Sequence, residues 1–150
     1  MKLSVRNLAE YMECFDTVLN WIYEEWGHNN REFWSGWIKS SLSEHDIPQT
    51  YVVFYRSELV GTFSLWRCDL QSRQDLFPWL GGIVVEKKWR GQGIGLFIQN
   101  EAKKVLKNLG YRKAYLFTEM TGYYEKTGWL YIETGFDERN EAVRLYELNV

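Results

Sequence analysis

The sequence has little cysteine and little proline. Only 2 of its 150 residues are Cys and only 2 are Pro. Cys14 and Cys68 are too few for a disulfide framework, and they lack the spacing of a zinc site. His28 and His45 lie far apart and outside any metal-ligand motif. We therefore expect no bound metal and a reducing, cytoplasmic environment.

Long hydrophobic runs and an excess of positive charge are also absent. No apolar stretch approaches the ~18 residues that span a bilayer, and none follows the N-terminal basic residue as in a signal peptide. The formal net charge is −2 at pH 7. Binding to a phosphate backbone needs a basic field. Neither a membrane nor a nucleic acid is therefore expected as a partner.

Aromatic residues are abundant, at 17% of the chain with 8 Trp and 10 Tyr. With 45% hydrophobic residues, a chain of this length can form one ordinary domain with its own core, over residues 1–150. Most of the aromatic side chains must pack in that core. A minority could line a ligand groove, where large flat side chains are common.

The spacing of apolar residues predicts an α/β domain with a mixed sheet. Helices are expected over residues 8–26, from about 30 to 45, over 94–109 and over 122–127. Strands are expected over residues 2–5, 51–55, 59–66, 79–85, 114–117, 129–133 and 142–148. The second helix should bury Phe33, Trp34, Trp37, Ile38 and Leu42. One strand–helix–strand crossover, around the helix over 94–109, should be parallel and right-handed.

The segment most informative about function is the junction after the strand at 79–85. That strand is continuously apolar, which favours burial on both faces. Gly81 and Gly82 within it indicate a bulge or the close approach of another chain or a ligand. The sequence 91–95 then reads Gly-Gln-Gly-Ile-Gly and leads into a helix. Such a loop exposes backbone N–H groups at a helix N-terminus, which suits a phosphate or pyrophosphate. The spacing fits neither a GxGxxG fingerprint nor a Walker A loop, and an ordinary glycine-rich turn is the alternative.

Two motifs give this junction a family resemblance. The run Arg90-Gly91-Gln92-Gly93-Ile94-Gly95 matches the Arg/Gln-x-x-Gly-x-Gly/Ala signature of the GNAT superfamily of N-acetyltransferases. Residues 123–129, Tyr-Tyr-Glu-Lys-Thr-Gly-Trp, resemble that family's Leu-Tyr-Glu-Lys-x-Gly-Phe segment. The resemblance implies a central, mostly antiparallel sheet with helices on both faces and a βαβ crossover at the coenzyme A site.

The resemblance also implies acetyl-CoA as cosubstrate and assigns roles to residues. The pyrophosphate would bind at Arg90, Gly91, Gln92, Gly93, Ile94 and Gly95. The pantetheine arm would pair with the backbone of Ile83, Val84 and Val85. Tyr124 would be the general acid that protonates the leaving thiolate, since Tyr123 occupies the family's apolar Leu position.

The general base is left open, because the strand before the loop carries no carboxylate. Asp69, Asp75 and Glu119 lie at strand ends and are substitutes, although a solvated loop carboxylate is the simpler interpretation of each. Cys68 could carry an acetyl group in a double-displacement route, but a small apolar strand residue is the simpler interpretation.

The expected reaction is acetyl transfer from acetyl-CoA to a primary amine of a small molecule, by direct attack in a ternary complex. The alternatives are a protein or peptide N-acetyltransferase and a non-catalytic CoA-binding sensor. The acceptor site should involve the first two helices and the hairpin, where Trp26, Trp34, Trp37 and Trp66 are available. The acceptor and the oligomeric state are left open, with a homodimer as one option.

Overall fold

The computed structural model describes residues 1–28 and 30–150. The strands are β1 (Leu3–Asn7), β2 (Gln49–Tyr55), β3 (Glu58–Trp66), β4 (Trp79–Val85), β5 (Lys113–Thr118), β6 (Leu130–Phe136) and β7 (Ala142–Asn149). The helices are α1 (Phe15–Trp26), α2 (Arg31–Lys39) and α3 (Ile94–Asn108). Short 3₁₀ turns are η1 (Leu8–Glu10), η2 (Met12–Cys14), η3 (Lys87–Trp89) and η4 (Tyr124–Thr127). All seven expected strands are confirmed.

The strands form one sheet in the order β1-β2-β3-β4-β5-β7-β6. Only the β4–β5 pair is parallel, as the predicted crossover through α3 requires. The other neighbours are antiparallel, including the predicted β2–β3 hairpin and the closing β6–β7 pair. The expected mixed, mostly antiparallel α/β fold is therefore confirmed. β7 lies between β5 and β6, so that β6 forms an edge of the sheet.

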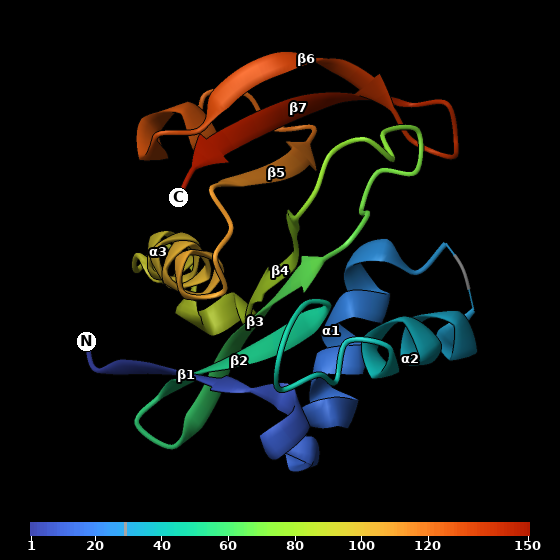
Figure 1. The fold of residues 1–150 in the computed structure, drawn as a ribbon. Helices are drawn as coiled ribbons and strands as arrows, with labels where there is room; N and C mark the ends of the chain where they lie inside the picture. Colours follow the sequence, from blue (N-terminus) through green and yellow to red (C-terminus); the bar gives the residue numbers. More distant parts are fainter. Residues whose placement is uncertain (29) are drawn as a thin grey trace.

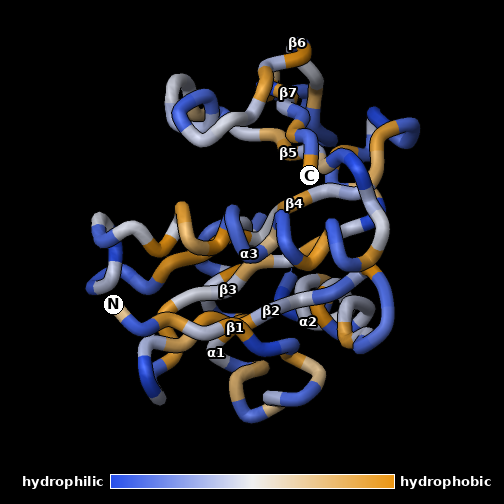
Figure 2. The backbone as a smooth tube through the Cα atoms, turned by 60° about the vertical axis from the view of Figure 1, so that its left-hand side comes forward, coloured by the Kyte–Doolittle hydropathy of each residue, from blue (hydrophilic) through white to orange (hydrophobic). Residues whose placement is uncertain are grey.

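Helices cover both faces of the sheet (Figures 1 and 2). Adjacent residues of β2 point to opposite sides, because side chains alternate along a strand. Val53 belongs to the core under α3, together with Ile98 and Leu106 of that helix. Val52 belongs to a second core under α1 and α2. Figure 2 shows α3 on one side of β2 and β3, with α1 and α2 on the other.

The N-terminal helices are shorter than the apolar spacing predicts. Residues 8–14 form the two 3₁₀ turns η1 and η2, and the α-helix begins only at Phe15. The Asn7 side chain accepts a hydrogen bond from Ala9 N (2.9 Å), so it caps the first of these turns rather than a long helix. α2 begins near Asn30 as predicted, and the Asn30 side chain caps it by accepting a hydrogen bond from Phe33 N (2.8 Å).

The prediction that Phe33 is buried is wrong, because this side chain is 41% exposed. α2 ends at Lys39, and only Ile38 of its predicted apolar set is fully buried. No helix in the described part of the chain is long and apolar enough to cross a membrane.

Candidate active site

The strand β4 separates from β5 almost as soon as the two have met. Their only paired residues are Trp79 and Tyr115, at the start of β4. Beyond that point, β4 has β3 as its only strand partner among residues 1–28 and 30–150. The backbone edge of β4 that faces β5 is therefore open, as pairing with an extended, amide-containing ligand requires.

The predicted bulge lies in this open part of β4. Gly82 has a φ of +58°, and the β3–β4 register shifts between Thr62 and Ser64. The expectation of burial on both faces holds only in part. Leu80 and Val84 are buried, whereas Ile83 and Val85 are half-buried. Ile83, Val84 and Val85, the residues assigned to the pantetheine arm, thus lie on the open stretch of β4.

The glycine loop has the geometry of an anion site at the start of α3. Gly91 and Gly93 have φ values of +73° and +86°, in the left-handed region that favours glycine. A β-carbon at either position would meet no atom within 4 Å, so the loop backbone faces open space. The first N–H groups of a helix have no intrahelical partner. Gly93 is the N-cap of α3, and these residues therefore fit a pyrophosphate.

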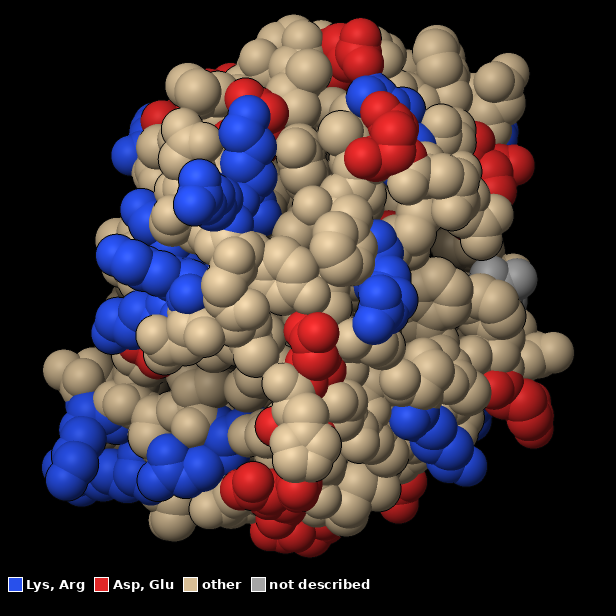
Figure 3. Space-filling model, in the orientation of Figure 1, with Lys and Arg blue, Asp and Glu red and all other residues tan. Residues whose placement is uncertain are grey.

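Arg90 connects the loop to the end of β4. Its Nε donates to the Val85 carbonyl (2.8 Å), and Nη2 lies 3.5 Å from Glu25 of α1. Beside them is a groove of about 310 Å³ that is also lined by Val84 and Lys87. The predicted site residues Val84, Val85 and Arg90 therefore share one groove. Figure 3 shows further Lys and Arg side chains gathered on the α3 side of the molecule.

The two tyrosines of the second motif lie in different environments. The Tyr124 ring packs in the core against Trp129 and Tyr146, with ring centroids 6.2 Å and 6.0 Å away. Burial, followed by the effect of Tyr123, raises the pKa of Tyr124 to about 12. The Tyr123 hydroxyl instead lies 2.7 Å from where a β-carbon on Gly95 would be. Tyr123 thus touches the first turn of α3, and the sequence does not indicate this contact.

The candidate general bases differ sharply in environment. Glu119 is exposed just beyond β5. Asp75 forms a two-bond ion pair with Arg73 (both 3.0 Å), which lowers the pKa of its carboxyl. Asp69 is partly buried against β4, and burial, followed by the Glu138 charge, raises its pKa to about 7. The three candidates are therefore not equivalent, and Asp69 is the one that the fold packs against β4.

A row of tryptophan contacts ends at Trp66, which lies beside Gly81 like Asp69. Trp37 of α2 contacts both Trp34 (6.1 Å between ring centroids) and Trp66 of β3 (5.5 Å), all in edge-to-face geometry. The structure thus brings together three of the four tryptophans expected at the acceptor site. Trp26 is 36% exposed and lies at the end of α1. Within residues 1–28 and 30–150, no three His, Cys, Asp or Glu side chains group as metal ligands.

A family model agrees with this architecture. The model of the acetyltransferase (GNAT) family matches residues 8–129. That segment is most of the chain and contains β4, the glycine loop, α3 and the Tyr124 motif. The chain therefore belongs to the GNAT family of acetyltransferases. A comparison with curated protein sequences gave no significant match.

Solved structures with the same fold support the assignment of the architecture. An aminoglycoside 6'-N-acetyltransferase complexed with coenzyme A has a TM-score of 0.78 at 15% identity, covering 99% of this chain and 97% of that one. A spermidine N-acetyltransferase chimera from Vibrio cholerae has a TM-score of 0.75 at 18% identity, covering 99% and 96%. A GNAT acetyltransferase from Elizabethkingia anophelis with acetyl-CoA bound scores 0.67 at 14% identity, covering 99% and 98%.

Proposed function

We propose that this acetyltransferase transfers the acetyl group of acetyl-CoA to a primary amine of a small molecule, by direct attack in a ternary complex. The observation that carries the proposal is the glycine loop at the N-terminus of α3, directly after the open edge of β4. In this arrangement residues 90–95 hold the pyrophosphate and the backbone of Ile83, Val84 and Val85 pairs with the pantetheine arm. The thioester is thereby directed toward the part of the sheet where β4 and β5 separate.

The chemistry is a transfer from sulfur to nitrogen. The amine lone pair forms a bond to the acetyl carbonyl carbon, the carbon–sulfur bond breaks, and the thiolate receives a proton. An ammonium and acetyl-CoA thus give an acetamide, free CoA and one proton released to solvent. The Tyr124 hydroxyl serves as the donor to the departing sulfur. Its high pKa keeps it protonated throughout the neutral range.

A covalent route through Cys68 is disfavoured by the state of its thiol. Burial, followed by the nearby Asp69 charge, raises the pKa of Cys68. Its sulfur donates to the Leu70 carbonyl (3.3 Å), so the thiol is protonated and engaged. Since the thiolate is the nucleophile, direct attack by the amine is the better-supported route.

The acceptor is proposed to be a cationic amine with apolar parts. Trp37, which packs on the buried Trp66, provides a flat apolar surface, while Asp69 and Glu138 provide negative charge on the same side of the sheet. Such a combination suits an ammonium through charge attraction and cation–π contact. The printed names of the structural neighbours, an aminoglycoside and a spermidine N-acetyltransferase, are in keeping with this class of acceptor.

The decisive experiment measures thiol release from acetyl-CoA with a panel of simple amines, polyamines, aminoglycosides and peptides. Acetylation of at least one small amine, with peptides poorer acceptors, supports the proposal. Preference for a peptide N-terminus or a lysine side chain would indicate that the acceptor is a protein and not a small molecule. CoA binding without thiol release from any acceptor would favour a sensor.

A further inference from the structure

Asp69 lies where β4 leaves its parallel partner. It belongs to the connection between β3 and β4, and its carboxylate packs so closely on Gly81 that a β-carbon there would overlap it. The Trp66 ring edge lies 3.1 Å from the same point. Trp66 contacts Trp37, so this is the face covered by α2, opposite α3. Gly81 directly precedes the bulge residue Gly82 and the proposed pantetheine-binding stretch, so Asp69 adjoins the proposed reaction centre.

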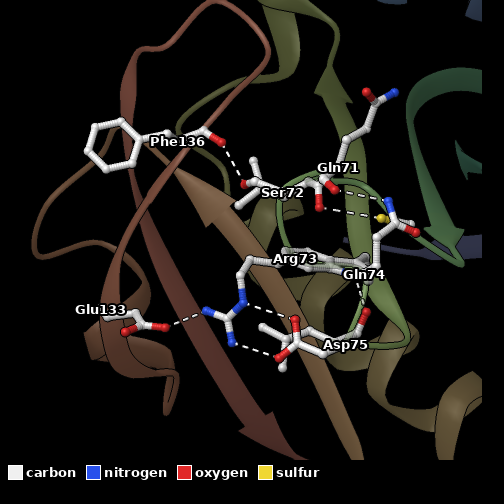
Figure 4. Close-up of polar contacts among 11 residues, drawn as sticks. Gln71, Ser72, Arg73, Gln74, Asp75, Glu133 and Phe136 are labelled. Atoms are coloured by element: carbon white, nitrogen blue, oxygen red, sulfur yellow. Dashed lines mark hydrogen bonds and ion pairs between the residues drawn. The ribbon is translucent and has the colours of Figure 1, made fainter.

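The connection that carries Asp69 is tied to β6 (Figure 4). The Ser72 hydroxyl donates to the Phe136 carbonyl (2.7 Å). Arg73 holds Asp75 through two hydrogen bonds of 3.0 Å and also pairs with Glu133 of β6. These contacts anchor Ser72 and Arg73, which follow Asp69 in the connection, to β6. The Asp69 carboxylate itself packs on Gly81 of β4.

Asp69 differs from Asp75, the other acidic residue of this connection, in having no cationic partner among the described residues. In the part of the chain that the structure describes, only burial and the like charge of Glu138 act on its carboxyl. Burying a carboxylate without a compensating partner is costly. Asp75 and Glu133, by contrast, both pair with Arg73. A partly buried carboxylate at the start of the open stretch of β4 would be stabilised by the cation that it lacks among the described residues.

The groups facing Asp69 set its proton affinity. Glu138, in the turn between β6 and β7, is the nearest acidic neighbour and pairs with His28 beyond α1 (3.2 Å). Cys68 precedes Asp69 in the chain and carries a protonated thiol. Gly81 of β4 and Trp66 of β3 contribute no charge. Burial and Glu138 therefore act in the same direction and raise the pKa of Asp69 to about 7.

We propose that Asp69 is the catalytic residue that binds the acceptor ammonium and takes its proton, an inference that rests on the proposed function. One proton moves from the ammonium nitrogen to a carboxylate oxygen of Asp69, which frees the lone pair for attack on the thioester carbon. Asp69 then releases this proton to solvent. The second proton lost by nitrogen balances the one that Tyr124 gives to sulfur. A base that titrates near neutrality is well matched to this role.

The test compares Asp69→Asn with the unaltered chain in its pH dependence. The unaltered enzyme should lose about tenfold in kcat/KM for the amine per pH unit below pH 7, because Asp69 of the free enzyme is then protonated. The midpoint of this acidic limb of the pH profile should stay near pH 7 for acceptors whose amine pKa values differ. Asp69→Asn keeps the shape of the side chain, and we expect it to lower kcat at pH 8 by about 10²–10⁴-fold and to abolish the limb. Binding of CoA should be unchanged.

Two further variants separate chemistry from structure. Asp75→Asn removes a carboxylate from the same connection, and its activity should keep the limb near pH 7. Gly81→Ala displaces the Asp69 carboxylate without removing it, and should lower kcat while CoA affinity persists. A direct NMR titration of Asp69 in the CoA-free chain gives a readout independent of turnover, with a midpoint near pH 7 expected.

The outcomes are distinguishable. If the unaltered chain releases thiol but Asp69→Asn keeps the limb or loses less than about threefold in kcat, Asp69 is not the base although the proposed function stands. A titration midpoint near pH 4 also overturns the inference. If no amine supports thiol release by the unaltered chain, the proposed function fails and this inference fails with it.

Discussion

Replacing Tyr124 by Phe removes one hydroxyl and leaves the ring in place. The ring packs against Trp129 and Tyr146, and Phe keeps those contacts. Within the described residues, burial and the adjacent Tyr123 account for the raised pKa, with no hydrogen bond from the Tyr124 hydroxyl contributing. We therefore expect Tyr124→Phe to leave the free energy of unfolding at pH 7 nearly unchanged.

The size of the catalytic effect follows from the Tyr124 pKa of about 12. A simple alkyl thiol such as that of Cys has a pKa of about 8.5. Full proton transfer from Tyr124 to a free thiolate would therefore be uphill by roughly 5 kcal/mol, at about 1.36 kcal/mol per pKa unit. In the transition state Tyr124 therefore acts mainly by donating a hydrogen bond to the sulfur as charge develops, and its proton passes fully to sulfur only as the second proton of the amine replaces it. Hydrogen bonds to charged groups contribute about 1.5–3 kcal/mol, so kcat should fall by about 10–150-fold.

The assay is thiol release at saturating acetyl-CoA and amine, with single-turnover measurements to isolate the chemical step. The Kd of CoA should stay within about twofold of the original. Tyr123→Phe is the matched control, and should affect kcat much less, although its contact with the first turn of α3 can alter CoA affinity. Full single-turnover rates in Tyr124→Phe would show that Tyr124 is a packing residue. Loss of CoA binding would instead make its hydroxyl a ligand contact.

Three further predictions concern the ligand, the loop and the pH dependence of stability. CoA at about 100 times its Kd should add about 2.7 kcal/mol to the free energy of unfolding, and no thermal shift at millimolar CoA in folded protein would contradict the assigned site. Gly93→Val should weaken CoA binding by more than it weakens folding, although the φ of +86° adds strain; calorimetry and thermal unfolding measured together check this, and unchanged affinity would indicate an ordinary turn. Because folding raises the pKa of Asp69 to about 7, the folded chain binds the extra proton and loses stability as pH rises from about 4 to 7. Asp69→Asn should lose less stability over this range in thermal unfolding, and parallel curves would contradict the assignment.

The sequence by itself determined the features that depend on local chemistry. The strands follow from runs of apolar and β-branched residues, and α3 follows from its apolar stripe and from Gly110, whose φ is +92°. The glycine loop was also visible, because left-handed backbone at Gly91 and Gly93 is a local requirement. The roles of residues 83–85 and 90–95 and of Tyr124 came from the family resemblance and remain predictions.

Apolar spacing gave wrong predictions of helix length and burial where turns or long-range packing decided the structure. Apolar spacing over residues 8–26 indicated one long helix, but two 3₁₀ turns precede Phe15. Phe33 has helical spacing and is still 41% exposed, and its ring packs on Trp34 and Trp37 of its own helix. The position of β7 between β5 and β6 likewise depends on long-range pairing, which no short window of sequence contains.

The candidate general bases also could not be distinguished from the sequence alone. Composition and spacing could place Asp69, Asp75 and Glu119 only at strand ends, where each resembles a solvated loop carboxylate. Only the tertiary structure shows that their environments differ. The fold packs Asp69 against Gly81 and brings Glu138 near Asp69 from a turn about 70 residues further along the chain. Asp75 instead forms an ion pair with Arg73. A pKa depends on burial and on charges within a few ångströms, and both are set by segments that only folding brings together.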